Sequence, residues 1–273
     1  MYELEYVKKR KRRIRVAIVG GVSTIVISAL AIVAFLGRYV GTFTVSLDTG
    51  NVELSLSDKS DFINRTSYLR VADLAPFHEY TYSNFRRIGY EVIDNEEYSY
   101  TLGANYSSDG STIETYNYFK YTFFVRNVGT QPCRYNFSVN ILDTSPSLDG
   151  RYLDETLRVM IFDNVGTDVH DNYTVYGKRS TTPHLDEEGK TDYRSPISVS
   201  EQDATEADPF EGYAEMFVST DIIASFPVNR IDIGETRRYT IVAWLEGFRS
   251  SNLEEAPQGA KIKLGVNINA YEI

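Results

Sequence analysis

The chain has 273 residues, with 28 lysines and arginines against 38 aspartates and glutamates. A net charge of -10 excludes the strongly cationic surface through which proteins bind phosphates of nucleic acid, so we expect no nucleic-acid partner. The single cysteine, Cys133, excludes an internal disulfide framework, and a chain of this length can bury a core without one.

The N-terminus carries a membrane signal. Residues 1–15 form a basic tail, and residues 16–37 follow with 22 residues and no charge. The positive residues that determine topology are Lys8, Lys9, Arg10, Lys11, Arg12, Arg13 and Arg15. A helix rising about 1.5 Å per residue over this apolar segment matches the roughly 30 Å hydrocarbon core of a bilayer. Because positive charge stays inside, we expect a cytoplasmic tail, a transmembrane helix in the plasma membrane and an extracellular region over 39–273.

A cleavable export signal is the alternative to a retained anchor. Signals usually have a shorter apolar core followed by a small-x-small cleavage site. Here the Ala29-x-Ala31 pair lies inside the apolar core, and bulky residues follow it. We therefore favour a retained anchor. The rest of the chain has 21 basic against 36 acidic side chains, which suits solubility outside the cell.

The extracellular region begins with apolar and polar residues alternating over 43–47, a turn at 48–51 and a second alternation over 52–56. A period of two is typical of a half-buried strand, so we expect a β-hairpin next to the membrane. The pattern recurs over 119–125 and 135–141, on either side of a turn-rich segment. Because this connection is short, we expect these two strands to be neighbours.

Further strands are predicted over 68–71, 156–162, 215–218, 238–245 and 262–270, and a short helix over 219–225. Residues 238–245 are apolar on both faces, which is typical of a central strand that is covered on both sides. Together these elements predict an all-β fold: an antiparallel two-sheet sandwich, jelly-roll or immunoglobulin-like, preceded by one N-terminal transmembrane helix.

Residues 164–213 interrupt the strand pattern. They hold 11 acidic against four basic side chains and three prolines, without a sustained period. We interpret them as an acidic insertion on one side of the sandwich. A solvated loop without a ligand is the simpler interpretation, and a functional loop is the alternative.

Motifs for catalysis are missing from the sequence. It contains no His-Glu-x-x-His, no Gly-x-Ser-x-Gly, no phosphate-binding Gly-Lys-Ser/Thr loop and no Gly-x-Gly-x-x-Gly. His78, His170 and His184 lie far apart, without the spacing of metal ligands. Cys133 has no activating base beside it, so we expect a packed thiol. We therefore expect no catalytic residue and no cofactor.

Calcium is the one metal with candidate ligands. Asp143, Asp149 and Asp154, with Glu155, could supply hard oxygen ligands around the turn at Pro146. The segment lacks the Asp-x-Asp-x-Asp-Gly order that makes a calcium loop specific. Carboxylates of the acidic insertion are equivalent candidates: Asp168, Asp171, Asp186, Glu187 and Glu188.

Several features form a recurring pattern. After the basic tail and the apolar segment come Gly41-Thr42-Phe43-Thr44-Val45, Asn127-Val128-Gly129-Thr130, Gly234-Glu235-Thr236, Trp244-Leu245-Glu246-Gly247 and Ile262-Lys263-Leu264. This pattern resembles the camelysin/TasA-type exported proteins of Gram-positive bacteria. The resemblance implies a jelly-roll sandwich at the cell surface, which in some members assembles into biofilm-matrix fibres by lending an N-terminal strand to the next subunit. The small-residue cleavage site usual in that family is not evident before residue 43, and no metal motif supports the protease activity attributed to some members.

Three functions stay open. The leading one is a non-enzymatic, membrane-anchored surface protein with a structural, adhesive or matrix-assembly role, which could bind further copies or other surface proteins by β-strand addition. The second is a ligand-binding or sensory ectodomain, which would need a membrane partner because the 15-residue tail is too short for a signalling domain. The third is a surface hydrolase, supported only by carboxylates in the acidic insertion.

Overall fold

The structure is a computed structural model. It describes residues 43–50, 52–71, 79–80, 82, 104–106, 112–116, 118–165, 172–186, 188–198, 210–246 and 260–273. The predicted basic tail 1–15 and the apolar segment 16–37 lie outside the described residues. Within the described part of the chain, no helix is long and apolar enough to cross a membrane.

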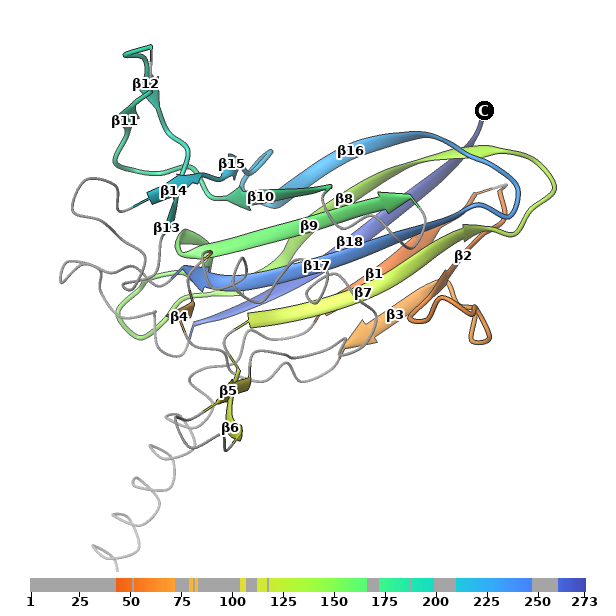
Figure 1. The fold of residues 1–273 in the computed structure, drawn as a ribbon, viewed down its shortest axis with the longest axis horizontal. Helices are drawn as coiled ribbons and strands as arrows, with labels where there is room; N and C mark the ends of the chain where they lie inside the picture. The colour runs from red at the N-terminus through yellow and green to blue at the C-terminus, as the bar shows by residue number, and fades with distance from the viewer. Residues whose placement is uncertain are drawn as a thin grey trace, which may run out of the picture. The chain divides into compact units, whose positions relative to one another are not determined.

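The described strands form two large sheets that lie in two layers (Figure 1). The five-stranded sheet has the order β16 (Ile222–Ile231), β8 (Cys133–Ser145), β18 (Lys261–Glu272), β1 (Phe43–Asp48), β3 (Tyr68–Val71). The seven-stranded sheet has the order β15 (Glu215–Met216), β10 (Tyr173–Gly177), β9 (Leu157–Val165), β17 (Thr236–Glu246), β7 (Tyr118–Asn127), β2 (Leu54–Ser57), and β4 (Glu79–Tyr80) pairs with β17.

Smaller elements join the strands of the two sheets. They are the pairs β5 (Ala104–Tyr106) with β6 (Thr112–Tyr116), β11 (His184–Leu185) with β12 (Thr191–Asp192) and β13 (Pro196–Ser198) with β14 (Phe210–Tyr213), and the 3-10 turn η1 (Leu153–Glu155). The acidic insertion 164–213 is thus not one loop, because it contains β10 and the last two of these pairs.

The two sheets are mixed, which corrects the prediction of an antiparallel sandwich. Strand β1 runs parallel to β18, from Phe43 opposite Leu264 to Asp48 opposite Asn269, and antiparallel to β3 on its other side. The pairs β10/β15 and β17/β4 are also parallel. Parallel strands need a long connection, and between β1 and β18 the connection is almost the whole domain. Alternation in a sequence reports a buried face but not the direction of the neighbouring strand.

Both predicted strand pairings were wrong for one physical reason. β1 and β2 belong to different sheets, and so do β7 and β8. Each pair is an arch that crosses from one sheet to the other, so that the apolar faces of its two strands meet across the sandwich. A hairpin would have placed both faces on the same side of one sheet. The buried Asn127 holds the second arch: its amide nitrogen donates to the carbonyl oxygen of Gln131 at 2.8 Å, and its Oδ1 accepts from the nitrogen of Gly129 at 2.9 Å.

The main core lies between the sheets and is rich in aromatic rings. Phe123 of β7 stacks on Phe137 of β8, with centroids 6.4 Å apart, and Phe137 stacks on Tyr239 of β17 at 4.4 Å. Phe43 of β1 packs against Phe119 at 4.9 Å. All five side chains are 0–1% exposed. The interdigitated faces of the two sheets therefore form one continuous apolar layer.

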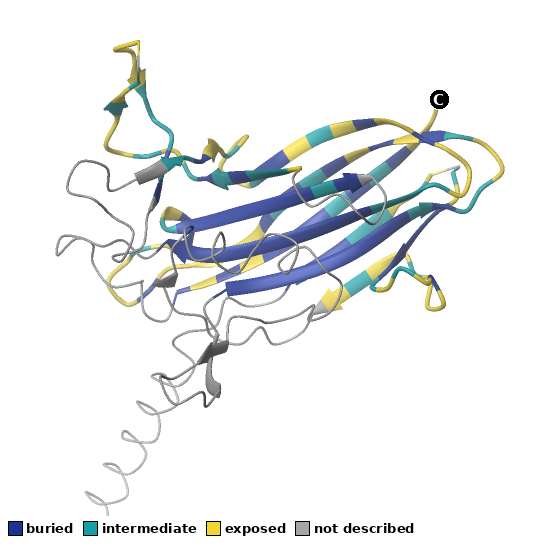
Figure 2. Ribbon diagram, in the orientation of Figure 1, coloured by how far each residue is buried: buried dark blue, intermediate teal, exposed yellow. Residues whose placement is uncertain are grey.

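A second apolar cluster covers the outer face of the seven-stranded sheet. Strands β9, β17 and β7 are buried over most of their length (Figure 2). Trp244 and Val242 of β17 are fully buried in this cluster, and Ile197 and Ala214 from the region of β13 and β14 pack onto it. The prediction that 238–245 is a central strand covered on both faces is confirmed. Part of the insertion thus covers the sheet rather than extending into solvent.

The remaining predicted elements are four strands and one short helix. Strands at 68–71, 156–162 and 262–270 are confirmed by β3, β9 and β18, and the strand predicted over 215–218 is confirmed only at 215–216, by β15. The helix expected over 219–225 is wrong, because residues 222–231 form β16, with Ile223 and Ala224 buried in the main core.

Truncating Phe43 should test how firmly β1 belongs to the core. Phe43→Ala removes a fully buried ring that contacts Phe119, and we expect a loss of about 3–5 kcal/mol in the free energy of unfolding. Urea denaturation followed by the fluorescence of the single, buried Trp244 measures it. Leu148→Ala is the control, since Leu148 is 94% exposed and should change stability by less than about 0.5 kcal/mol. Equal effects of the two changes would contradict the buried position of β1.

Candidate functional site

A chain of polar side chains crosses the interior of the sandwich. Tyr135 of β8 and Tyr239 of β17 are buried, and their hydroxyl groups lie 2.6 Å apart across the two sheets. Asp163 of β9 lies opposite Tyr239 in the pairing of β9 with β17, and the hydroxyl of Tyr239 reaches its carboxylate. Asp163 in turn lies 4.0 Å from Arg237, which lies 3.4 Å from Glu235. Alternation along β17 places Arg237 and Tyr239 on the same inward face.

Burial determines the protonation of these polar side chains. Burial raises the pKa of Tyr135 and raises that of Tyr239 well above the ordinary value, so both hydroxyls keep their protons at neutral pH and can donate. Burial also raises the pKa of Asp163, against the opposing effects of Arg237 and of the hydrogen bond from Tyr239. The Oδ1 atom of Asp163 is buried and has no hydrogen-bond partner among the described residues. An acid perturbed in this way next to a cavity is typical of a functional site.

Asp163 also lines a cavity of about 330 Å³. Its lining residues come from the region of β9 and β10 in one sheet and from β16 in the other. Figure 1 shows these strands along one edge of the sandwich, which we call the seam. The lining residues of the cavity are Ile161, Asp163, Asn172, Tyr173, Thr174, Tyr176 and Phe226. Two hydrogen bonds fix its edge: the amide nitrogen of Asn172 donates to the carbonyl oxygen of Asp163 at 2.6 Å, and the nitrogen of Asp163 donates to the carbonyl oxygen of Asn172 at 3.1 Å. We call this the seam cavity.

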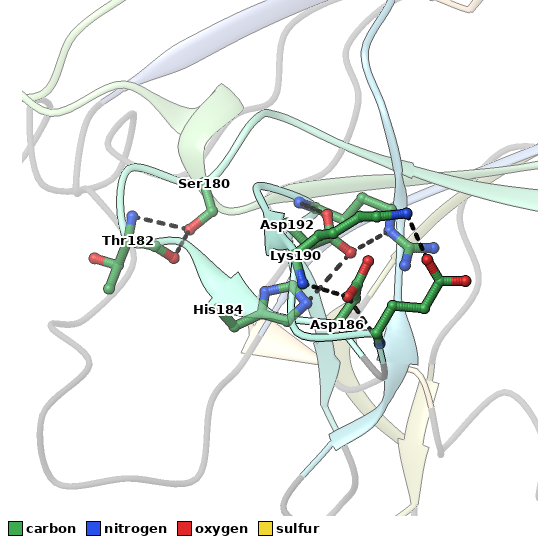
Figure 3. Close-up of polar contacts among 8 residues, drawn as sticks. Ser180, Thr182, His184, Asp186, Lys190 and Asp192 are labelled. Carbon is green, nitrogen blue, oxygen red and sulfur yellow. Dashed lines mark hydrogen bonds and ion pairs between the residues drawn. The ribbon is translucent and has the colours of Figure 1, made fainter.

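A second polar cluster surrounds β11 and β12 (Figure 3). The ring of His184 stacks on that of Tyr213 at 3.7 Å, and its Nε2 lies 3.4 Å from Asp192. Arg194 forms a 2.7 Å ion pair with Asp192. Hydrogen bonds from the backbone and the side chain of Arg194 hold the pKa of Asp192 below its ordinary value. A cavity of about 400 Å³ lies beside these residues and is lined also by Leu185, Asp186 and Glu188.

The carboxylates of this second cluster already stabilise the local fold. Oδ1 of Asp186 accepts from the backbone nitrogens of Glu188 at 3.0 Å and Lys190 at 2.7 Å, which closes the turn between β11 and β12. Glu188 pairs with the side chain of Lys190. These acidic residues therefore act as turn caps and ion-pair partners, and the seam cavity is the stronger candidate for a binding site.

The calcium candidates do not meet at one point. Asp143 is exposed on β8, opposite Lys263 of β18. Asp149 forms a 2.7 Å ion pair with Arg151, and Asp154 a 2.8 Å ion pair with Lys178. Among the described residues, no group of three or more histidine, cysteine, aspartate or glutamate side chains could hold a metal ion. The candidates His78, His170, Asp168, Asp171 and Glu187 lie outside the described residues.

Cys133 is a packed residue at the start of β8. Its side chain is 1% exposed, and burial raises the pKa of its thiol. A protonated, enclosed thiol is a poor nucleophile. This placement agrees with the expectation from the sequence.

The sequence pattern did not indicate Asp163, Tyr239 and Arg237 as a group. The predicted strand 156–162 stopped one residue short of Asp163, although Ile161 and Asp163 continue the same alternation into a polar position. Tyr135 and Tyr239 were assigned to strands, but 104 residues separate them. The one indication in the sequence was Asp163 itself, a charged residue at an inward-facing position at the end of a predicted strand.

Replacing Asp163 should reveal the cost of burying its charge. Because its pKa is raised in the folded state, the folded protein holds this proton more tightly than the unfolded chain, and stability falls as pH rises through the raised value. Asp163→Asn cannot ionise, so it should be more stable than the unchanged chain at about pH 7 and lose that advantage towards about pH 4. Urea midpoints across this pH range measure the difference.

Asp149→Asn is the matched control for this experiment. Hydrogen bonds from Ser147 and Arg151 hold the pKa of Asp149 at about 2, so its ionised form is favoured in the folded state. That contribution is present above the ordinary pKa and is lost as pH falls, so the control should gain nothing at neutral pH. A destabilised Asp163→Asn variant at neutral pH would contradict the assignment of Asp163 as a buried, penalised charge.

No protein-family model, no curated protein and no solved structure matches the chain. The described residues form a two-sheet all-β domain with a polar cavity at its seam.

Proposed function

We propose that this chain is a membrane-anchored protein of the cell surface whose β-sandwich has a structural, adhesive or matrix-assembly role. The observation that carries the proposal is the position of β1. It begins six residues after the apolar segment 16–37 and lies inside the five-stranded sheet, between β18 and β3. The proposed anchor is therefore joined to a core strand of the domain through residues 38–42.

The pairing of β1 suits a load-bearing connection. Six residues of β1 pair with β18, and Phe43 and Val45 are fully buried. Tension along β1 acts parallel to the strand, so the hydrogen bonds to β18 resist it together and do not open one at a time. A domain held in this way would keep β1 in its sheet under load.

The same strand could also join neighbouring copies. Removing β1 would expose the edges of β18 and β3 together with the apolar groove that Phe43 and Val45 fill. A second copy could supply the missing strand, because strand addition restores both the backbone hydrogen bonds and the buried side chains. Such exchange is the assembly mode implied by the resemblance to camelysin/TasA-type proteins with a jelly-roll sandwich.

The anchor is tested by sequencing the N-terminus of the native surface protein after separating membranes from the soluble fraction. A retained anchor predicts a membrane-bound form that keeps residues 1–37, because an apolar segment of 22 residues partitions into the bilayer. A soluble form that starts between Arg38 and Thr42 would refute the anchor.

Strand exchange is tested with a disulfide between β1 and β18. Ser46 lies opposite Asn267, and its hydroxyl donates to Oδ1 of Asn267 at 2.8 Å. Adjacent strands bring paired Cα atoms within disulfide range, so the Ser46→Cys/Asn267→Cys variant should crosslink on oxidation. Exchange predicts covalent ladders in assembled material and crosslinks within single chains in the monomer, as resolved by non-reducing electrophoresis. Crosslinks confined to single chains in assembled material would contradict strand exchange.

A ligand-binding ectodomain is the second candidate function, and the seam cavity favours it. A largely preformed cavity with convergent polar groups and a perturbed acid is the usual form of a small-molecule site. The two functions are compatible, because an adhesive domain needs a surface that recognises its target.

A further inference from the structure

We propose that the seam cavity binds a neutral, hydroxyl-rich ligand, namely a sugar unit of an extracellular polysaccharide. The inference goes beyond the surface role proposed above and does not depend on the anchor, since a cleaved domain would keep the same cavity. It rests on the walls of the cavity, the groups at its rim and the balance of charge around Asp163.

The apolar wall suits one face of a sugar ring. Phe226 of β16 stands opposite Ile161 and Tyr176 of the other sheet. The ring of Phe226 is backed by Phe137, stacked at 4.8 Å, so the wall is held by the main core. The C–H groups of a sugar carry partial positive charge and pack on the electron-rich face of an aromatic ring.

The polar rim suits the hydroxyl groups of the same ring. Asp163 offers a carboxylate that can only accept when ionised, whereas the hydroxyl of Thr174 and the amide of Asn172 can both donate and accept. A sugar hydroxyl also donates and accepts, so adjacent hydroxyls can pair with these groups at once. The amide of Asn172 is already oriented by its bond to the backbone of Asp163, which lowers the entropy lost on binding.

The charges around Asp163 favour a neutral sugar over a cation as the ligand. A carboxylate beside aromatic rings could also hold an ammonium group. Here the guanidinium of Arg237 lies 4.0 Å from Asp163 and 3.4 Å from Glu235, so it is shared by two carboxylates and offsets part of the charge of Asp163. A cation bound at Asp163 would lie next to this guanidinium and would be repelled by it. A neutral ligand avoids that repulsion and still uses the carboxylate as an acceptor. At about 330 Å³ the cavity is at the small end of ligand sites, which fits one unit of a longer chain that leaves through the open seam.

The test uses the full chain in lipid nanodiscs, because detergents with sugar headgroups would compete. The probes are glucose, galactose and N-acetylglucosamine, with tetramethylammonium as the cationic probe, all followed by saturation-transfer NMR and titration. We expect binding of at least one neutral sugar and none of the cation. Asp163→Asn should weaken sugar binding by roughly tenfold, since it replaces a charged acceptor by a neutral amide. Glu188→Gln, at an exposed carboxylate outside the seam cavity, should bind as the unchanged chain does.

Stability measurements separate weaker binding from loss of folding. The urea midpoint of Asp163→Asn at neutral pH is measured alongside binding, and a midpoint at or above that of the unchanged chain shows that weaker binding does not result from unfolding. Phe226→Ser provides an independent check on the apolar wall and should also weaken binding. The proposal is overturned if no neutral sugar binds, if sugar binding is unchanged in both cavity variants, or if tetramethylammonium binds more tightly than every sugar.

Discussion

The rest of the structure depends on the burial of two apolar sheet faces against each other. The contact is tightest where Phe123, Phe137 and Tyr239 stack across the sandwich, with the last two centroids 4.4 Å apart. Because each strand alternates in and out, this one contact also determines which residues face outward and where polar groups can enter. It explains the arches, since consecutive strands can bury their apolar faces against each other only by crossing between the sheets.

The apolar contact between the two sheets ends at the row of buried polar side chains. From Tyr135 through Tyr239 to Asp163 and Arg237, the inward positions of three strands change from aromatic to charged. Buried polar groups are tolerated when they are paired, and the hydroxyl pair at 2.6 Å supplies that pairing in the centre. Towards the seam the pairing becomes looser, and there the sandwich opens into a cavity. The polar side chains that interrupt the apolar core therefore also supply a polar group of the cavity, the carboxylate of Asp163.

The position of β1 connects the core to the proposed surface role. A strand inside the sheet cannot leave without exposing Phe43 and Val45, so a self-contained domain and a strand-exchanged assembly differ only in which copy supplies that strand. The seam cavity lies between β9, β10 and β16. In the five-stranded sheet β8 and β18 separate β16 from β1, and β9 and β10 belong to the other sheet. Assembly through β1 and recognition at the seam could thus occur on the same domain without competing.

The sequence alone predicted the class of fold, most strand positions and the central place of 238–245, because alternation and two-faced apolarity are local properties of the chain. It also carries the membrane signal of 1–37, which lies outside the described residues. Strand partners were decided only by the tertiary structure: β1 and β2, like β7 and β8, separate into different sheets, and the first and last strands pair in parallel. The candidate site could not be predicted from the sequence for the same reason, since Tyr135, Asp163 and Tyr239 lie on three separate strands. Only packing, which joins residues about 100 positions apart, brings them together.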